Sequence, residues 1–201
     1  LSADVPDAAQ MNDVFIYNNA GTLTLEVLAW TNDTTRATAL ATQDGVYVKS
    51  GATGRRYIGS FRSTTDGNGQ TEDSLAKRWV WNYYNRVVRP MRVVEATNTW
   101  TYTTAAFQQA NASAANQLDY VQGVSEDPVR ADVLACFSND NAGVAVAVGV
   151  GVDSTSTNSA QVVSGAISQV VNARFDAQAF YRGYPAVGRH ILAWLEYSTA
   201  T

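Results

Sequence analysis

Residues 55–92 read RRYIGSFRSTTDGNGQTEDSLAKRWVWNYYNRVVRPMR, and this stretch directs our prediction of the fold. It contains seven of the twelve arginines, one of the two lysines and two of the five tryptophans. With its three acidic residues it carries a charge of +5, whereas the whole chain of 201 residues carries −4. A polar loop, Ser63 to Gln70, separates a predicted strand, Tyr57 to Phe61, from a second half that is dense in aromatic residues.

The secondary structure of the second half is ambiguous from sequence. The i, i+4 spacing of Leu75, Trp79 and Tyr83 favours a helix, whereas the Trp, Tyr and Val content favours a strand. We predict one or two helical turns near residues 71–77, where polar residues suit a helix start. A long strand then follows and ends at Pro90, which has no N–H to donate to a sheet.

Two functions are open for this basic, aromatic stretch. It forms either a surface for nucleic acid or glycan, or a structural segment whose aromatic residues pack inward while its arginines face solvent or pair with acids. The sequence pI of about 4.9 favours the structural interpretation, because phosphate-binding domains usually carry a basic balance. We therefore predict that nucleic acid is not a partner.

Composition indicates one globular domain. The chain is long enough for a substantial core, and 46% of its residues are hydrophobic, whereas only 16% are charged. The single cysteine, Cys136, cannot form an internal disulfide, and we expect a buried thiol that acts as a small hydrophobe. The chain shows no apolar run of membrane-spanning length, so we predict no membrane insertion. It begins with Leu1, and we expect a fragment or a processed product.

Turn signals recur along the chain about every 8–15 residues, which is typical of antiparallel β-proteins. Valine alternates with alanine or glycine from Val144 to Val152, which predicts a strand with one bulky face and one face that allows close backbone approach. Further strands are predicted at 14–17, 22–30, 36–40, 46–49, 92–102 (two strands), 118–124, 129–138, 161–175 (a pair) and 190–197.

We therefore predict an all-β fold, an antiparallel β-sandwich of jelly-roll type. A single domain spans residues 13–201 after an N-terminal arm or linker of residues 1–12. Helix is confined to one or two short segments, near 71–77 and 105–116. No repeat or linker divides the chain.

Catalytic and metal-binding motifs are absent from the sequence. His190 is the only histidine and lies in an apolar strand pattern, so we expect a strand side chain and not a catalytic base. No CxxC, HExxH, GxSxG or phosphate-binding loop occurs. A pair of glycosidase carboxylates stays open, because two such acids can lie far apart in sequence. We predict no enzyme activity, no cofactor and no metal.

Two loops are candidate binding sites, because function concentrates in loops held by a rigid scaffold. The loop 63–70 offers Asp66, Asn68 and Gln70, whose polar side chains suit sugar hydroxyls. The loop 182–188 and the residue before it offer two aromatic rings beside a cation: Tyr181, Arg182 and Tyr184. Trp100 could also stack on a sugar ring. The alternative is that both loops are plain connectors and that the aromatic rings pack in the core or an interface.

Five segments, in order, resemble a domain found toward the C-terminal ends of tailed-bacteriophage virion proteins. They cover most of the chain from Val14 onward: DGVYVK (44–49), RRYIGSFR (55–62), QTEDS (70–74), WNYYNR (81–86) leading to Arg89-Pro90, and GRH (188–190) with WLE (194–196). The resemblance implies a virion structural protein located on the extracellular phage particle, with other virion proteins as partners. It supplies no catalytic residues.

This resemblance suggests a non-enzymatic module of a tail fibre or spike that binds a host receptor or glycan. One alternative is a capsid-surface decoration or head-fibre protein that stabilises the shell, and another is a polysaccharide-degrading spike domain. We also predict a homo-oligomer, a trimer. The low charge density and the apolar run 143–152 would supply surface for symmetric assembly, which also covers sheet edges.

Overall fold

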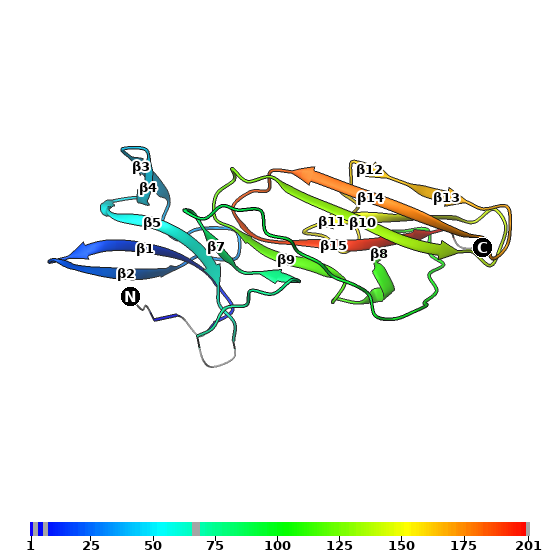
Figure 1. The fold of residues 1–201 in the computed structure, drawn as a ribbon, viewed down its shortest axis with the longest axis horizontal. Coiled ribbons are helices and arrows are strands. Elements are labelled where there is room, and N and C mark those ends of the chain that lie inside the picture. Colours follow the sequence, from blue (N-terminus) through cyan, green and yellow to red (C-terminus); the bar gives the residue numbers. More distant parts are fainter. Residues whose placement is uncertain (2–3, 6–7, 66–68, 200–201) are drawn as a thin grey trace. The chain divides into compact units, whose positions relative to one another are not determined.

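The computed structural model describes residues 1, 4–5, 8–65, 69–199 and is all-β, which confirms the predicted fold class (Figure 1). Its one helical element is a three-residue 3₁₀ turn, Ala110–Ala112, within those residues. Contacts divide the chain into unit 1 (1–91, 119–126, 186–189) and unit 2 (92–118, 127–185, 190–201). The two units alternate along the sequence, so no linker marks a boundary. The jelly-roll connectivity and the single domain stay predictions.

Unit 1 contains a sheet in the order β2-β1-β5-β4-β3, with a short strand, β7 (Val80–Asn82), also pairing with β5. Two tight turns connect its hairpins, because the residues at each turn adopt a positive φ. The φ angles are 49° and 93° at Ala20 and Gly21, and 51° and 80° at Asp44 and Gly45. The other strands are β1 (Met11–Asn19), β2 (Thr22–Ala29), β3 (Leu40–Gln43), β4 (Val46–Lys49) and β5 (Ala52–Arg62).

Two apolar clusters form the core of unit 1. Phe15, Tyr57 and Val124 make one of them, and Met11, Trp30, Trp79 and Val121 make the other. The strand β1 begins at Met11, so Met11 and Asn12 are buried strand residues and not part of the predicted arm.

The predicted helix near 71–77 and the long strand after it are wrong. The polar residues that suit a helix start form a tight turn instead, because the Ser74 hydroxyl accepts a hydrogen bond from the Lys77 N–H and Glu72 pairs with the Lys77 ammonium. Only β6 (Lys77–Arg78) and β7 follow, and β6 pairs in parallel with β9 (Gln117–Gln122). The two strands predicted within 92–102 are also absent from this fully described segment.

Unit 2 contains two packed layers of strands. One layer has the order β10-β14-β12, formed by β10 (Val129–Ser138), β14 (Arg174–Gly183) and β12 (Val162–Val163). The other contains β13 (Gly165–Ile167), β11 (Ala145–Val152) and β15 (Gly188–Ser198), with β8 (Gln108–Gln109) also on β15. β11 lies against β10 and β14. The loop 139–143 therefore connects two different sheets and does not form a hairpin.

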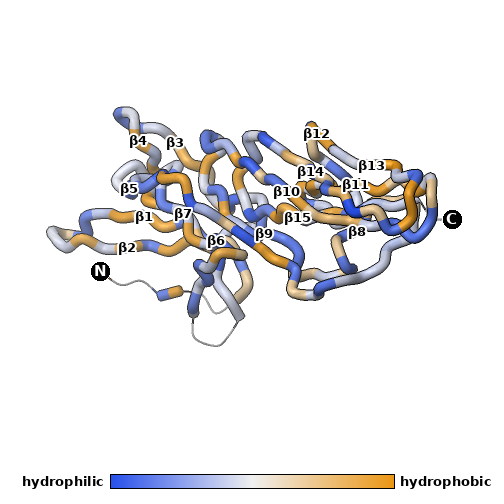
Figure 2. The backbone as a smooth tube through the Cα atoms, turned by 45° about the vertical axis from the view of Figure 1, so that its right-hand side comes forward, coloured by the Kyte–Doolittle hydropathy of each residue, from blue (hydrophilic) through white to orange (hydrophobic). Residues whose placement is uncertain are grey.

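The valine-rich strand β11 forms the centre of unit 2 (Figure 2). Val148 and Val150 are 0% and 1% exposed, which confirms the predicted bulky inward face. Gly151 also lies in close contact, because a Cβ there would lie 3.3 Å from the Leu195 side chain. This strand is internal to unit 2, so it does not supply the free oligomer surface predicted from sequence.

Candidate functional site

The candidate site is a cavity of about 270 Å³ in unit 2, here called the Trp100 pocket. Four segments that are far apart in sequence line it: Val93, Val94, Glu95, Trp100, Leu134, Ala135, Cys136 and Trp194. The wall is mainly apolar, with one carboxylate. Binding sites for small molecules are usually concave and apolar with a few polar groups, and this cavity has that character at the small end of the range.

One wall of the pocket is the edge strand β10. The carbonyls of Gln178 and Phe180 in β14 accept hydrogen bonds on the side away from β10, from Ser164 and Gln161. Because backbone direction alternates along a strand, the residues that bond β14 are the odd-numbered ones of β10. The N–H and C=O groups of Leu134 and Cys136 therefore point outward, and the described residues place no partner on them.

The second wall is a pair of tryptophan rings. Trp100 and Trp194 lie edge to face, with ring centroids 5.9 Å apart and planes at 75°. The indole N–H of Trp100 donates to Glu196 at 2.5 Å, which fixes its ring. The indole nitrogen of Trp194 is buried without a hydrogen-bond partner among the described residues. Both rings are half-buried, so part of each is accessible.

Two carboxylates, Glu95 and Glu196, fix the segment that carries Trp100. Asn111 joins them, because its N–H donates to Glu196 at 2.9 Å and its side-chain amide donates to Glu95 at 3.2 Å. The Thr97 N–H and the Asn116 amide also donate to Glu95, and these hydrogen bonds lower its pKa to about 2. Gln108 gives Glu196 a further neutral donor, at 2.9 Å.

The two carboxylates beside the pocket do not have the character of a glycosidase acid pair. A glycosidase needs one carboxylic acid that stays protonated near neutral pH, and such an acid has a raised pKa. Glu95 has a lowered pKa, and neutral donors occupy oxygens of both carboxylates. The described residues contain no cluster of three or more His, Cys, Asp or Glu that could hold a metal. They also contain no helix with the length and apolarity of a membrane span.

The basic stretch of unit 1 is structural in character. Among the described residues, six of its eight cations form ion pairs: Arg55 with Glu26, Arg62 with Asp33, Lys77 with Glu72, Arg78 and Arg89 with Asp73, and Arg86 with Glu126. Tyr57, Phe61 and Trp79 pack inward, as the structural interpretation predicted, whereas Tyr84 is exposed.

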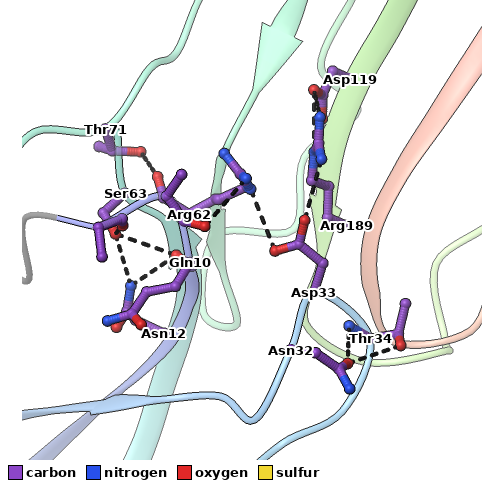
Figure 3. A network of polar contacts seen from close by, with 12 residues as sticks. Gln10, Asn12, Asn32, Asp33, Thr34, Arg62, Ser63, Thr71, Asp119 and Arg189 are labelled. Atoms are coloured by element: carbon purple, nitrogen blue, oxygen red, sulfur yellow. Dashed lines mark hydrogen bonds and ion pairs between the residues drawn. The ribbon is translucent and has the colours of Figure 1, made fainter. Parts of the chain in front are cut away.

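Figure 3 shows one of these acids, Asp33, between two arginines. Arg62 and Arg189 lie 3.4 Å and 3.1 Å from the Asp33 carboxylate, and Arg189 also binds Asp119 at 2.7 Å. Both guanidinium groups lie over the ring of Trp79, at 4.8 Å and 5.9 Å from its centroid. These contacts leave little free positive charge for phosphate.

The loop residues predicted to bind a ligand divide between the two units. Asp66 and Asn68 lie outside the described residues, and Gln70 is exposed in unit 1. Tyr181 and Arg182 belong to strand β14 and not to a loop, whereas Tyr184 follows that strand and is 70% exposed. Their binding role stays a prediction, and none of them lines the Trp100 pocket.

His190 and Cys136 differ in how well the sequence predicted them. His190 is a buried side chain of β15, as predicted, and its Nδ1 lies 2.8 Å from Asp153. Asp153 also accepts a hydrogen bond from the Ile191 N–H, so the pair fixes a loop to the strand. Cys136 is exposed, which corrects the predicted buried thiol, because even-numbered side chains of β10 face outward.

Sequence reasoning singled out Trp100 as an aromatic ring suited to a sugar and missed the rest of the pocket. Trp194 could have been found only by its alternation with buried neighbours on the last strand. No protein-family model matches this chain, and neither the curated proteins nor the solved structures give a match.

Proposed function

We propose that this chain is a non-enzymatic surface module of a tailed-bacteriophage particle, of the tail-fibre or spike kind, and that its Trp100 pocket binds a host-surface glycan. The virion assignment rests on the resemblance of the five sequence segments. The glycan assignment rests on one observation, which is the combination of aromatic walls and outward backbone groups in one pocket.

A sugar ring presents an apolar C–H face and a rim of hydroxyl groups. The rings of Trp100 and Trp194 suit the apolar face, because indoles offer large rigid apolar area. The outward N–H and C=O groups of Leu134 and Cys136 suit the hydroxyl rim, since each can donate or accept one hydrogen bond. A volume of about 270 Å³ suits one or two sugar units, with the rest of a chain outside.

The test is a titration of the purified chain with oligosaccharides prepared from the host surface, followed by tryptophan fluorescence. Leu134→Arg and Val94→Asp each place a charge in the pocket, and we expect binding at least tenfold weaker. Both residues are 67% exposed, so the melting temperature should stay nearly unchanged.

Tyr184→Ala is the matched control, because Tyr184 is 70% exposed and lies outside the pocket. Loss of binding in this variant alone would assign the site to the end of β14 and contradict the pocket. Release of new reducing ends would support the polysaccharide-degrading alternative. Binding to phage shells without binding to host glycan would support the capsid-decoration alternative.

A further inference from the structure

An exposed, uncharged segment forms one edge of each sheet in unit 2. β12 is the outermost strand of one layer, and β13, which follows it after a single residue, is the outermost strand of the other. The segment from Ser154 to Ala173 contains no charged residue and no proline. Apolar side chains on this edge are exposed: Val162 44%, Val163 40%, Ile167 63%, Val170 66% and Val171 47%.

An edge strand with free backbone groups and exposed apolar side chains tends to pair with another chain unless it is protected. Natural edge strands are protected from pairing with other chains by charges, prolines or bulges, and this segment lacks both charge and proline. In Figure 2 orange parts of the tube at β12 and β13 mark apolar residues on this edge. Exposed apolar surface of this kind usually marks an interface.

The backbone of β13 is free to pair outward. The backbone N–H and C=O of Ala145 form hydrogen bonds with Thr199, which follows β15, so the odd-numbered residues of β11 direct their backbone groups toward β15. The even-numbered residues of β11 therefore direct theirs toward β13. Val146 lies opposite Ala166, and this pair therefore exchanges the hydrogen bonds within the unit. Gly165 and Ile167 consequently direct their N–H and C=O groups outward, and the described residues place no partner on them.

We propose that this edge is an interface between two copies of the chain, in which the two β13 strands pair antiparallel about a two-fold axis at Ala166. The pairing sets Gly165 opposite Ile167 of the second copy, so both outward-facing residues exchange hydrogen bonds. It also sets Ser164 opposite Ser168, next to the ends of β13.

The second copy fits this edge because its chemistry matches itself at each of these positions. Ile167 covers the position where Gly165 has no side chain, and no like charges meet across the axis. A two-fold contact joins two chains, so the assembly proposed through this edge is a dimer, whereas the trimer predicted from sequence stays a prediction. The interface is separate from the Trp100 pocket and does not depend on glycan binding.

The test is sedimentation velocity at about 10 μM. We expect a dimer for the wild type, a monomer for Ile167→Lys, and a dimer for the control Val88→Lys, whose site is 98% exposed in unit 1. A monomeric wild type, a trimer, or a dimer that Ile167→Lys leaves intact would overturn the proposal.

A cross-link tests the register. In a Cys136→Ser background, Ala166→Cys should form a disulfide between the two chains, because a non-hydrogen-bonded pair has Cα atoms about 4.5 Å apart, within disulfide range. Ser164→Cys should not, since it faces Ser168 of the second copy. A cross-link at 164 without one at 166 would contradict the two-fold axis at Ala166. We expect the Ile167→Lys monomer still to bind glycan. A failure of the dimer proposal is therefore distinguishable from a failure of the proposed function.

Discussion

At the scale of the residue, the most strongly constrained group of unit 1 is the buried carboxylate of Asp13. Arg36 binds it at 2.8 Å and Ser60 donates to it at 2.7 Å, and its side chain is only 2% exposed. Burial raises the pKa of Asp13, and the Arg36 charge partly offsets that rise. Arg36 also lies 4.5 Å over the ring of Trp30, so it joins polar and apolar parts of the core.

Removing the arginine should therefore be costly. We expect Arg36→Met to destabilise the protein by about 3–5 kcal/mol, because it leaves a buried charge without its partner. The double variant Arg36→Met with Asp13→Asn should recover part of this loss, since no unpaired charge remains. Urea unfolding of the three proteins measures both quantities. Equal losses in the single and double variants would contradict this account.

Glu95 gives a dependence on pH. Its pKa is lowered to about 2 in the folded protein from an ordinary value of 4.5. A carboxylate with a lowered pKa contributes stability above its unfolded pKa and loses it as the pH falls through its folded pKa. We expect Glu95→Gln to remove this contribution, so that the variant loses less stability than the wild type between pH 4.5 and pH 2. Urea unfolding at several pH values measures the free energy of unfolding of both proteins. If this free energy falls equally in both proteins over that range, the hydrogen bonds of Glu95 do not supply the pH-dependent stability.

At the scale of the element, close backbone approach at β11 depends on glycine. An added Cβ at Gly151 would lie 3.1 Å from the Ser154 carbonyl carbon and 3.3 Å from Leu195. We expect Gly151→Ala to cost about 1–3 kcal/mol, because the core has no room for a methyl group there. Gly54→Ala is the matched control: no atom lies within 4 Å of its Cβ, and its change should stay within about 0.5 kcal/mol. Thermal unfolding of both variants decides the matter.

Local pattern predicted some elements well and others poorly, for a physical reason. β10 was predicted with its exact bounds and β11 to within one residue, because alternation over eight or more positions is typical of a strand and does not fit the period of a helix. Residues 71–77 were predicted wrongly, because the polar side chains that cap a helix also form turns. The choice between the two depends on the partner Lys77, whose position tertiary contacts fix.

The Trp100 pocket lay largely beyond sequence reasoning, because four separate segments build it. The sequence suggested Trp100 as a ring that could stack on a sugar, whereas Leu134 and Trp194 were predicted only as strand residues. The outward direction of the Leu134 and Cys136 backbone groups depends on the pairing of β10 with β14, which lies about 45 residues further along. The sequence does not reveal such pairings. For the same reason the exposure of Cys136 was missed.

At the scale of the whole molecule, charge is unevenly divided. Unit 1 contains ten of the fourteen basic and eleven of the eighteen acidic residues, and unit 2 contains the rest. Ion pairs use most of the cations in the basic stretch of unit 1. Unit 2 instead presents the Trp100 pocket, whose lining residues are apolar apart from Glu95, and the uncharged edge formed by β12 and β13. These surfaces suit the proposed glycan binding and self-association.

This division predicts that the chain does not bind nucleic acid, because the acids neutralise the cations of its basic stretch and the net charge is −4. We expect no binding of duplex DNA at 150 mM NaCl by fluorescence anisotropy. The double variant Glu72→Gln, Asp73→Asn frees Lys77, Arg78 and Arg89, and it should gain weak binding that salt abolishes. Asp140→Asn, Asp176→Asn has the same net charge but frees no cation of this stretch, so it should stay inactive. Tight binding by the wild type would contradict the structural interpretation of residues 55–92.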